Sequence, residues 1–247
     1  MPKLTTLLSP AMFDATVLDA SNKVIVVIDI FRATSTMTVG MENGAKAIYP
    51  VKDVATASKA GASFIKAGER NGMRVEGFDL GNSPREFTAD IVRDRDIVMT
   101  TTNGTRSISM SESAKQILIS SYRNIQATIS YLVSSKEDVV LFCSGWKELV
   151  NIEDTLFAGE LASALCDNGF EIDNDATHIA MAVYEKNKTN IDGFLQKASH
   201  VKRIKKLQSE GDVEACLRRN TCQCVLEVKD GKVVQLETSN QKPATGD

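Results

Sequence analysis

The sequence predicts an α/β fold with three layers, α/β/α, around a mostly parallel or mixed sheet. Residues Val24–Ile28 form a continuous apolar, β-branched run, which is typical of a parallel strand covered on both faces. Such runs alternate along the chain with segments of helical periodicity, as in βαβ units. A chain of 247 residues is near the upper limit for one hydrophobic core. We therefore expect one domain over residues 1–247, with two similar, tightly packed subdomains of about 1–120 and 121–247 as the alternative.

The first half reads as repeated strand, loop and helix units. Strands are expected at 24–28, 47–51, 63–67 and 96–100, and helices at 37–41, 53–60 and 105–111. The segment Gly68–Phe87 contains four glycines, one proline and seven charged residues, so we expect a long loop there. Long loops inside compact domains often carry function, which makes this one a candidate for a binding site.

The second half continues this pattern and ends in a hairpin. Strands are expected at 116–119 and 139–143, helices at 122–135, 151–168 and 175–186, an exposed basic helix at 200–206, and a hairpin of 221–228 with 232–236. Ligands of parallel sheets bind beyond the carboxyl ends of the strands. On that rule, polar residues that follow the strands should meet at one edge of the sheet: Asp29, Arg32, Glu69, Asn103 and Ser144.

Composition and charge exclude several classes of function. The chain is 43% hydrophobic and 25% charged, which is ordinary for a soluble enzyme. Its net charge of -3 provides no positive field for nucleic acid or an anionic membrane. No apolar run approaches the length of a membrane span, and the N-terminus lacks the apolar core of a signal peptide. Five cysteines at irregular spacing indicate free thiols and a cytoplasmic location, and Cys222 and Cys224 lack a second pair for a zinc site.

Two hydroxyl-rich turns are candidates for phosphate binding. Asp29-x-x-Arg32 is followed by Thr34-Ser35-Thr36, which places a carboxylate, a guanidinium and three hydroxyls at the start of a helix. Thr101–Thr105 repeats this arrangement without charge. The alternative for the first turn is helix capping with a surface ion pair, and for the second an ordinary turn. The second Asp of haloacid dehalogenases, a Cys-x5-Arg loop and a Walker sequence are missing, which leaves carboxylate and metal chemistry.

Five motifs, in order along the chain, resemble those of the 2-phosphosulfolactate phosphatase family. They are Val27–Thr36, Gly68–Arg70, Gly77–Pro84, Thr101–Thr105 and Glu153–Thr155. The resemblance covers roughly residues 3–236 and departs from the family pattern at His200–Lys202 and Cys222–Leu226. It implies Mg²⁺-dependent hydrolysis of 2-phospho-3-sulfolactate to sulfolactate and phosphate, a step in coenzyme M formation, and a homodimer. The alternatives are a phosphatase for another small anionic phosphate ester, or a non-catalytic anion-binding regulatory protein.

On this resemblance we assign roles to the candidate residues. The expected Mg²⁺ ligands are Asp29, Glu69, Asp79 and Asp154. The residues expected to bind the phosphate ester are Arg32, Thr34, Ser35, Thr36, Asn82, Ser83, Asn103, Gly104 and Thr105, with Arg70 or Arg85 for the sulfonate or carboxylate. Glu153 is the candidate base that orients the attacking water. Whether Asp29 is a metal ligand or attacks phosphorus itself is left open.

Overall fold

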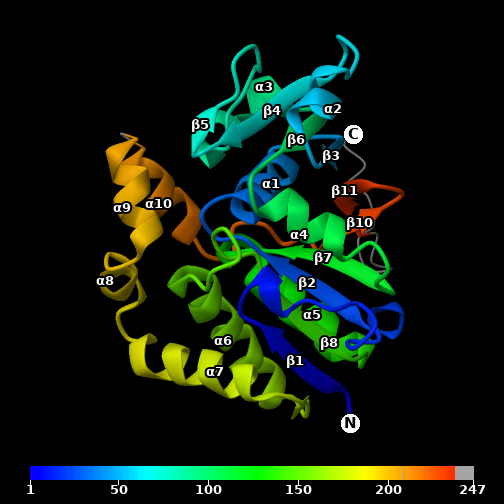
Figure 1. Cartoon of the computed structure of the whole chain (residues 1–247), viewed down its shortest axis with the longest axis vertical. Coiled ribbons are helices and arrows are strands. Elements are labelled where there is room, and N and C mark those ends of the chain that lie inside the picture. The colour runs from blue at the N-terminus through cyan, green and yellow to red at the C-terminus, as the bar shows by residue number, and fades with distance from the viewer. Residues whose placement is uncertain (208, 237–247) are drawn as a thin grey trace, which may run out of the picture.

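One mixed sheet of 11 strands runs through the computed structural model, which describes residues 1–207 and 209–236 (Figure 1). The strands in chain order are β1 (Lys3–Leu7), β2 (Val24–Ile28), β3 (Ala47–Pro50), β4 (Ile65–Arg70), β5 (Met73–Arg74), β6 (Asp96–Thr100), β7 (Gln116–Ser120), β8 (Val139–Cys143), β9 (Glu171–Ile172), β10 (Leu226–Lys229) and β11 (Lys232–Gln235). Their order across the sheet is β5-β4-β6-β3-β11-β10-β7-β2-β8-β1-β9.

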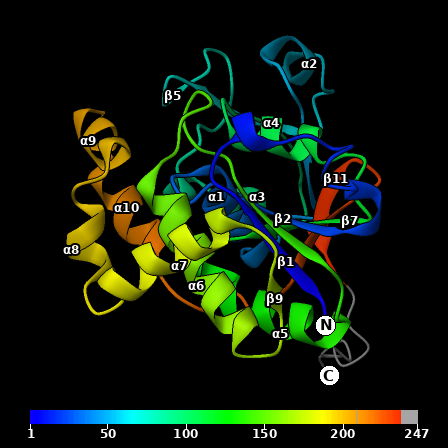
Figure 2. The ribbon, with the colours of Figure 1, turned by 60° about the horizontal axis from the view of Figure 1, so that its bottom comes forward.

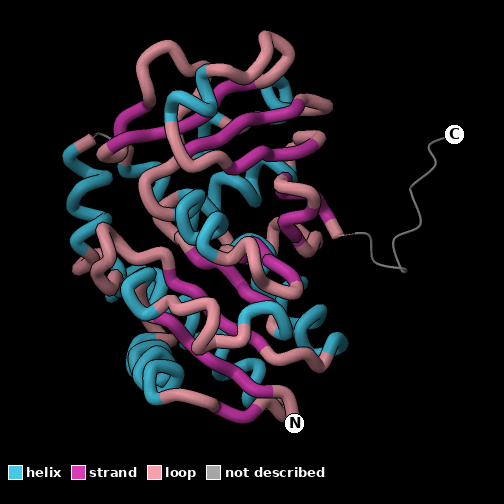
Figure 3. Tube along the Cα trace, turned by 45° about the vertical axis from the view of Figure 1, so that its right-hand side comes forward, coloured by secondary structure: helices cyan, strands magenta, loops and turns pink. Residues whose placement is uncertain are grey.

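The sheet consists of two parallel groups of strands joined by an antiparallel hairpin. One group is β4, β6 and β3, and the other is β7, β2, β8, β1 and β9. The hairpin β10–β11 lies between them, with β10 antiparallel to β7 and β11 antiparallel to β3. Three antiparallel pairings in succession make the two groups run in opposite directions along the sheet. Figure 3 shows the two sets of strands in the upper and lower parts of the molecule.

Helices cover both faces of the sheet. They are α1 (Ala33–Glu42), α2 (Val54–Ser58), α3 (Ala89–Val92), α4 (Gly104–Met110), α5 (Ile125–Ser135), α6 (Ile152–Cys166), α7 (Asp175–Asn187), α8 (Ile191–Leu195), α9 (Ser199–Lys206) and α10 (Glu210–Leu217). Alternate side chains of β2 enter different cores, as expected for a strand buried on both faces. Val24, Val26 and Ile28 pack with residues of α5, α6 and α7, whereas Ile25 and Val27 pack with residues of α1 and α4. The course of β2 and of these helices can be followed in Figure 2. The predicted three-layer α/β/α fold is confirmed.

Most predicted elements are present, and the differences lie where tertiary contacts override the local pattern. In the predicted loop 68–87, β4 continues to Arg70, and a short strand, Met73–Arg74, and a 3-10 turn, Pro84–Glu86, follow. The helix at 200–206 was expected to be exposed, but Val201 and Ile204 are buried, so one face packs on the protein. The sequence pattern did not predict β1, β9, α3, α8 or α10.

The prediction of five free thiols is wrong for one pair. Cys222 and Cys224 form a disulfide, with Cα atoms 5.4 Å apart, within the range that a disulfide can span. The two residues lie just before β10, with one residue between them. Cys143, Cys166 and Cys216 are free. Within the described residues, no helix is both long and apolar enough to cross a membrane.

Candidate active site

A small cavity of about 30 Å³ lies where the loops after β2 and β6 meet the end of β4, under helix α9. Its lining residues are Asp29, Phe31, Arg32, Glu69, Asn71, Gly72, Asn82, Asn103, Trp146, His200, Arg203, Ile204 and Leu207. Four of the five strand-end residues expected to meet are therefore together. Ser144 is fully buried and does not line the cavity.

The strand-end residues do not come together at one common edge of parallel strands, as the sequence had led us to expect. A common edge explains why Glu69 lies near the β6 loop, because β4 and β6 are parallel, but β2 runs in the opposite direction. Five strand-to-strand steps separate β2 from β6, and a typical twist of about 20–25° at each step would rotate the two groups by about 100–125°, so that their carboxyl ends need not point in opposite directions. They meet at Gly104, where an added Cβ would lie 2.4 Å from Ala33 Cβ and 2.9 Å from Asp29 Oδ2.

Negative charge gathers in the cavity around Asp29. This side chain is 6% exposed, and burial raises the pKa of its carboxyl to about 6. The carboxylates of Glu69 and Glu153 also raise the Asp29 pKa, whereas His200 lowers it. Glu69 accepts hydrogen bonds from the main-chain N–H groups of Gly72 and Thr102, each at 2.7 Å. Glu69 thus ties the loop after β4 to the loop after β6, and both acidic groups face the same small space.

Arg32 is held by a buried ion pair that sequence analysis did not find. Its Nη1 lies 2.5 Å from Asp212 Oδ2, and its Nη2 donates to the Gly72 carbonyl oxygen at 3.0 Å. The hydroxyl of Ser83 donates to the other oxygen of Asp212 at 2.6 Å. The side chains of Arg32 and Asp212 are 6% and 1% exposed. Asp212 on α10 therefore fixes the orientation of Arg32 in the cavity wall.

Glu153, the predicted base, is bonded to a histidine. Its Oε1 lies 3.0 Å from His200 Nδ1, and the Glu153 side chain is 1% exposed. The imidazole ring packs edge-on against Phe31, with centroids 6.2 Å apart, and at a tilt against Trp146 at 5.4 Å. His200, rather than Glu153, lines the cavity. The group expected to contact water is thus placed to orient an imidazole.

The predicted phosphate-binding hydroxyls make bonds within the protein instead. Thr34 donates to the Asp29 carbonyl oxygen, Ser35 to that of Ile30 and Thr36 to that of Asn82. All three side chains are fully buried, and none lines the cavity. Thr105 likewise donates to the Thr101 carbonyl oxygen. The alternative of capping and turn formation therefore describes these hydroxyls better than phosphate binding does.

Two of the four expected metal ligands lie elsewhere. Asp79 is exposed, and its carboxylate accepts from the N–H of Lys66 at 2.8 Å. Asp154 is fully buried and accepts from the N–H groups of Ile30 and Gly145 and from the Asn151 amide. Burial, and next the charge of Asp29, raise the pKa of Asp154, while its N–H donors act in the opposite direction. Its position is thus structural, tying the end of β2 to the start of α6.

Only Asp29 and Glu69 of the expected set face the cavity. Within residues 1–207 and 209–236, no three His, Cys, Asp or Glu side chains lie close enough together to hold a metal ion. Mg²⁺, however, needs only one or two carboxylates, with water and substrate phosphate completing its shell. Asn82 also lines the cavity, and its buried Oδ1 has no hydrogen-bond partner among the described residues. This all-oxygen donor set fits Mg²⁺.

The two arginines expected to meet a second anionic group do not line this cavity. Arg70 donates to the Glu69 carbonyl oxygen and to Thr100 Oγ1. Arg85 is exposed and lines an adjoining open cavity of about 510 Å³. The open cavity shares four lining residues with the small one, so the two are continuous: Arg32, Gly72, Asn82 and Leu207.

The residues that α9 and the loop after β8 contribute to the cavity were not predicted from the sequence as site residues. Trp146 is the single tryptophan of the chain and follows the predicted strand 139–143 by three residues. His200, Arg203, Ile204 and Leu207 recur at intervals of three and four, which places them on one face of α9. Both signals were visible in the sequence, but a basic helix face is usually solvated.

Comparison with known proteins identifies one family. The sequence model described as 2-phosphosulpholactate phosphatase matches residues 12–231. A probable 2-phosphosulfolactate phosphatase of Clostridium acetobutylicum is 38% identical over 218 residues, 86% of this chain and 92% of the relative. A protein of the same description from Clostridium perfringens is 32% identical over 243 residues, 96% of this chain and 97% of the relative. Another, from Caldicellulosiruptor saccharolyticus, is 36% identical over 214 residues, 83% and 88% of the two chains.

Replacing Gly104 with alanine should destabilise the protein, because the new methyl group would overlap Ala33 and Asp29. Overpacking of this kind lowers the free energy of unfolding by about 1–3 kcal/mol. Urea denaturation followed by circular dichroism measures the change. The matched control is Gly61→Ala, since a Cβ at Gly61 meets nothing within 4 Å. Equal stability of the two variants would contradict the close approach at Gly104.

Removing Asp212 should destabilise the protein more than removing a surface carboxylate. Asp212→Ala leaves the buried Arg32 guanidinium without its counter-ion, which costs about 3–5 kcal/mol. The control is Glu137→Gln, which breaks an exposed pair with Lys115 and should cost less than about 1 kcal/mol. Thermal and chemical unfolding of both variants provide the comparison. A small effect of Asp212→Ala would show that the ion pair does not hold the wall together.

Proposed function

This chain belongs to the 2-phosphosulfolactate phosphatase family, and on that premise we propose that it hydrolyses 2-phospho-3-sulfolactate to 3-sulfolactate and phosphate. It is then a phosphoric monoester hydrolase with a role in coenzyme M formation. The observation that supports this activity is the meeting of Asp29, Arg32, Glu69 and Asn103 in one cavity. Carboxylates for a metal and donors for phosphoryl oxygens are the groups that such a hydrolysis needs.

In this proposal Asp29 and Glu69 would hold one Mg²⁺ ion, and the side-chain oxygen of Asn82, which lines the same cavity and lacks a partner among the described residues, would be a further oxygen donor. When bound, the ion supplies positive charge that stabilises the phosphoryl oxygens and the departing alkoxide. Arg32 and Asn103 supply hydrogen-bond donors at the same end of the cavity. Asp212 and Gly72 keep the Arg32 guanidinium in one orientation, so that little rearrangement is needed when the ester binds.

His200 exchanges the proton in this proposal. The bond from Nδ1 to Glu153 leaves Nε2 as the ring nitrogen that can donate to the leaving oxygen. Water supplies the hydroxyl that phosphorus gains, the bond from phosphorus to the ester oxygen breaks, and the departing alkoxide takes the proton of Nε2. The second proton of the water leaves through the phosphate product or solvent, and an equivalent proton returns to Nε2 and restores the charged ring. Glu153 stabilises the charged ring before that transfer and fixes its plane. Asp29 acts as a ligand, so trapping a phosphorylated Asp29 would overturn this assignment.

Removing the metal should abolish phosphate release from 2-phospho-3-sulfolactate. EDTA is expected to lower kcat/KM by at least about 100-fold, and added Mg²⁺ to restore it. The substitution Asp29→Asn should cause a loss of the same order that Mg²⁺ does not restore. A colorimetric phosphate assay with a panel of small phosphate esters measures both effects.

The matched control for Asp29→Asn is Asp79→Asn, because Asp79 is exposed and lies outside the cavity. This control should retain wild-type activity and Mg²⁺ dependence. An equal loss in both variants would return Asp79 to the ligand set. Full activity in EDTA would rule out the metal, and faster turnover of another ester would change the substrate.

His200→Gln should act on the leaving-group step alone. The loss of kcat is expected to be about 100- to 10,000-fold for an alkyl phosphate, whose leaving oxygen needs a proton. Hydrolysis of p-nitrophenyl phosphate should fall far less, because nitrophenolate leaves without protonation. His178, the other histidine of the chain, is exposed on α7, and His178→Gln serves as the control. Similar losses on both substrates would show that His200 does not act as the acid.

A further inference from the structure

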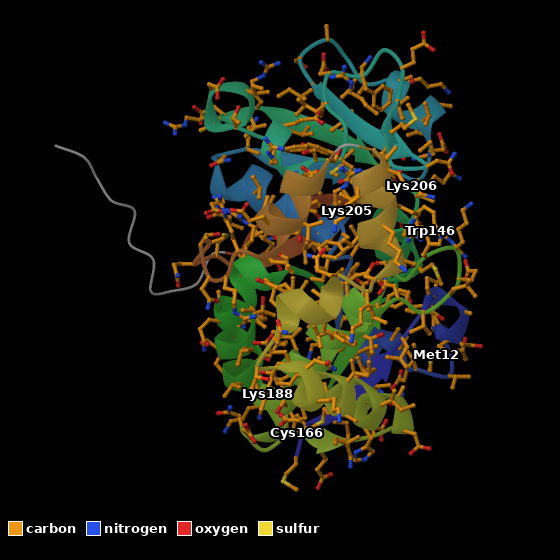
Figure 4. All side chains as sticks on the ribbon, turned by 90° about the vertical axis from the view of Figure 1, so that its left-hand side faces the viewer. Met12, Trp146, Cys166, Lys188, Lys205 and Lys206 are labelled. Carbon is orange, nitrogen blue, oxygen red and sulfur yellow. A yellow bond between two sulfur atoms is a disulfide. The ribbon has the colours of Figure 1, made fainter. Side chains whose placement is uncertain are left out.

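Arg203 lies on α9, in the part of the cavity wall that this helix forms. Its guanidinium carbon lies over the Trp146 ring, 4.2 Å from the ring centroid, which is a close cation–π contact. Both residues line the small cavity. Figure 4 shows Trp146 on the same side of the molecule as Lys205 and Lys206 of α9. Packing against a ring restrains the guanidinium, whereas the side chain of an exposed arginine is free to move.

The hydrogen-bonding edge of Arg203 is unused. Its Nη1 donates to Ser199 Oγ at 3.2 Å. Its Nε and Nη2 are buried and have no hydrogen-bond partner among the described residues. Nε–H and Nη2–H together form the side edge of a guanidinium, which binds a carboxylate, sulfonate or phosphate through two parallel hydrogen bonds. Burial of such an edge without a partner is unfavourable, so a bound anion would satisfy a hydrogen-bonding capacity that the described residues leave unused.

The surroundings of Arg203 do not compensate its charge fully. Burial lowers the pKa of the Arg203 guanidinium, and the charge of Glu153 raises it. Glu153 Oε1 is bonded to His200. Arg32, the other guanidinium of the cavity, already has Asp212 as its counter-ion. Arg203 is therefore the cavity arginine that keeps a bidentate edge for a ligand.

We propose that Arg203, packed against Trp146, forms an anion subsite for the carboxylate or sulfonate of the substrate, beside the groups that take its phosphoryl end. The inference rests on the proposed function only in naming the ester. Arg203, rather than Arg70 or Arg85, then binds the second anionic group of the substrate. A ligand with several charged groups exceeds the small cavity, and the adjoining open cavity gives it room to extend.

Trp146 provides a readout that does not need turnover. Because the chain has one tryptophan, its fluorescence reports on ligands that reach Arg203. Titration with 3-sulfolactate, lactate and 2-hydroxypropane-1-sulfonate separates the sulfonate from the carboxylate, and calorimetry checks each Kd. The variants are Arg203→Gln, which removes the charge, and Arg203→Lys, which keeps the charge but not the two-pronged edge. Lys202→Gln removes an exposed charge of the same helix as the control.

Arg203→Gln should raise the Kd for 3-sulfolactate about 10- to 100-fold, with Arg203→Lys in between and Lys202→Gln unchanged. If Arg203 binds the sulfonate, the loss appears with 2-hydroxypropane-1-sulfonate and not with lactate. If it binds the carboxylate, the reverse holds. Equal Kd values in all variants, or equal losses for ligands with and without each group, would overturn the subsite. Circular dichroism confirms that each variant is folded.

Kinetics separate this inference from the proposed function. Two reference esters are compared with 2-phospho-3-sulfolactate: 2-phospholactate, which lacks the sulfonate, and the 2-phosphate ester of 2-hydroxypropane-1-sulfonate, which lacks the carboxylate. The kcat/KM for 2-phospho-3-sulfolactate is divided by that for each reference ester. In Arg203→Gln, the ratio for the ester that lacks the group bound by Arg203 should fall toward one. A wild-type protein that hydrolyses none of these esters, yet binds 3-sulfolactate through Arg203, would reject the proposed function and keep the subsite. If the wild-type protein hydrolyses the ester but Arg203→Gln leaves these ratios and the Kd values unchanged, the proposed function stands and the Arg203 subsite is rejected.

Discussion

The close approach of α4 to the end of β2 is the constraint on which the site depends. Gly104 leaves no room for a side chain between Ala33 and Asp29, and this contact joins two groups of parallel strands that run in opposite directions. Glu69 adds a second connection through the Thr102 N–H. Without these contacts the carboxylates of Asp29 and Glu69 would belong to separate ends of the sheet, and no divalent cation could contact both.

Around that junction, most buried charges and polar groups have partners, and the exceptions mark the site. Arg32 is paired with Asp212, Glu153 with His200, and Asp154 with three N–H donors. Unmatched groups are costly in a protein interior, so they persist where a ligand completes them. Three groups of the described cavity lack full compensation. They are the carboxyl of Asp29, whose pKa is raised by burial, the side-chain oxygen of Asn82, and Nε and Nη2 of Arg203, which have no hydrogen-bond partner among the described residues. Together they suit a cation at one end and an anion at the other.

The hydroxyl-rich turn after β2 has a sequence pattern that is compatible with two different roles. Thr34, Ser35 and Thr36 fit both phosphate binding and helix formation, and in the structure all three bond to main-chain carbonyl oxygens. Asp29 and Arg32, from the same motif, do reach the cavity. The difference lies in the direction of each side chain, which depends on how α1 packs. Asp212 and Arg203 were not predicted as site residues for a related reason. Asp212 pairs with Arg32, 180 residues away, and Arg203 contacts Trp146 on another loop, so neither contact leaves a local pattern.

Most helices and strands, the three layers and the polar motifs at the strand ends could be predicted from the sequence, because hydrophobic periodicity and turn residues act over short distances. The sequence did not determine the relative direction of the two strand groups, which the hairpin β10–β11 reverses by inserting between β3 and β7. Nor did it determine which charges would be neutralised inside the protein. Both outcomes depend on pairings between residues far apart in the chain, which come into contact when the chain folds and leave no local pattern in the sequence.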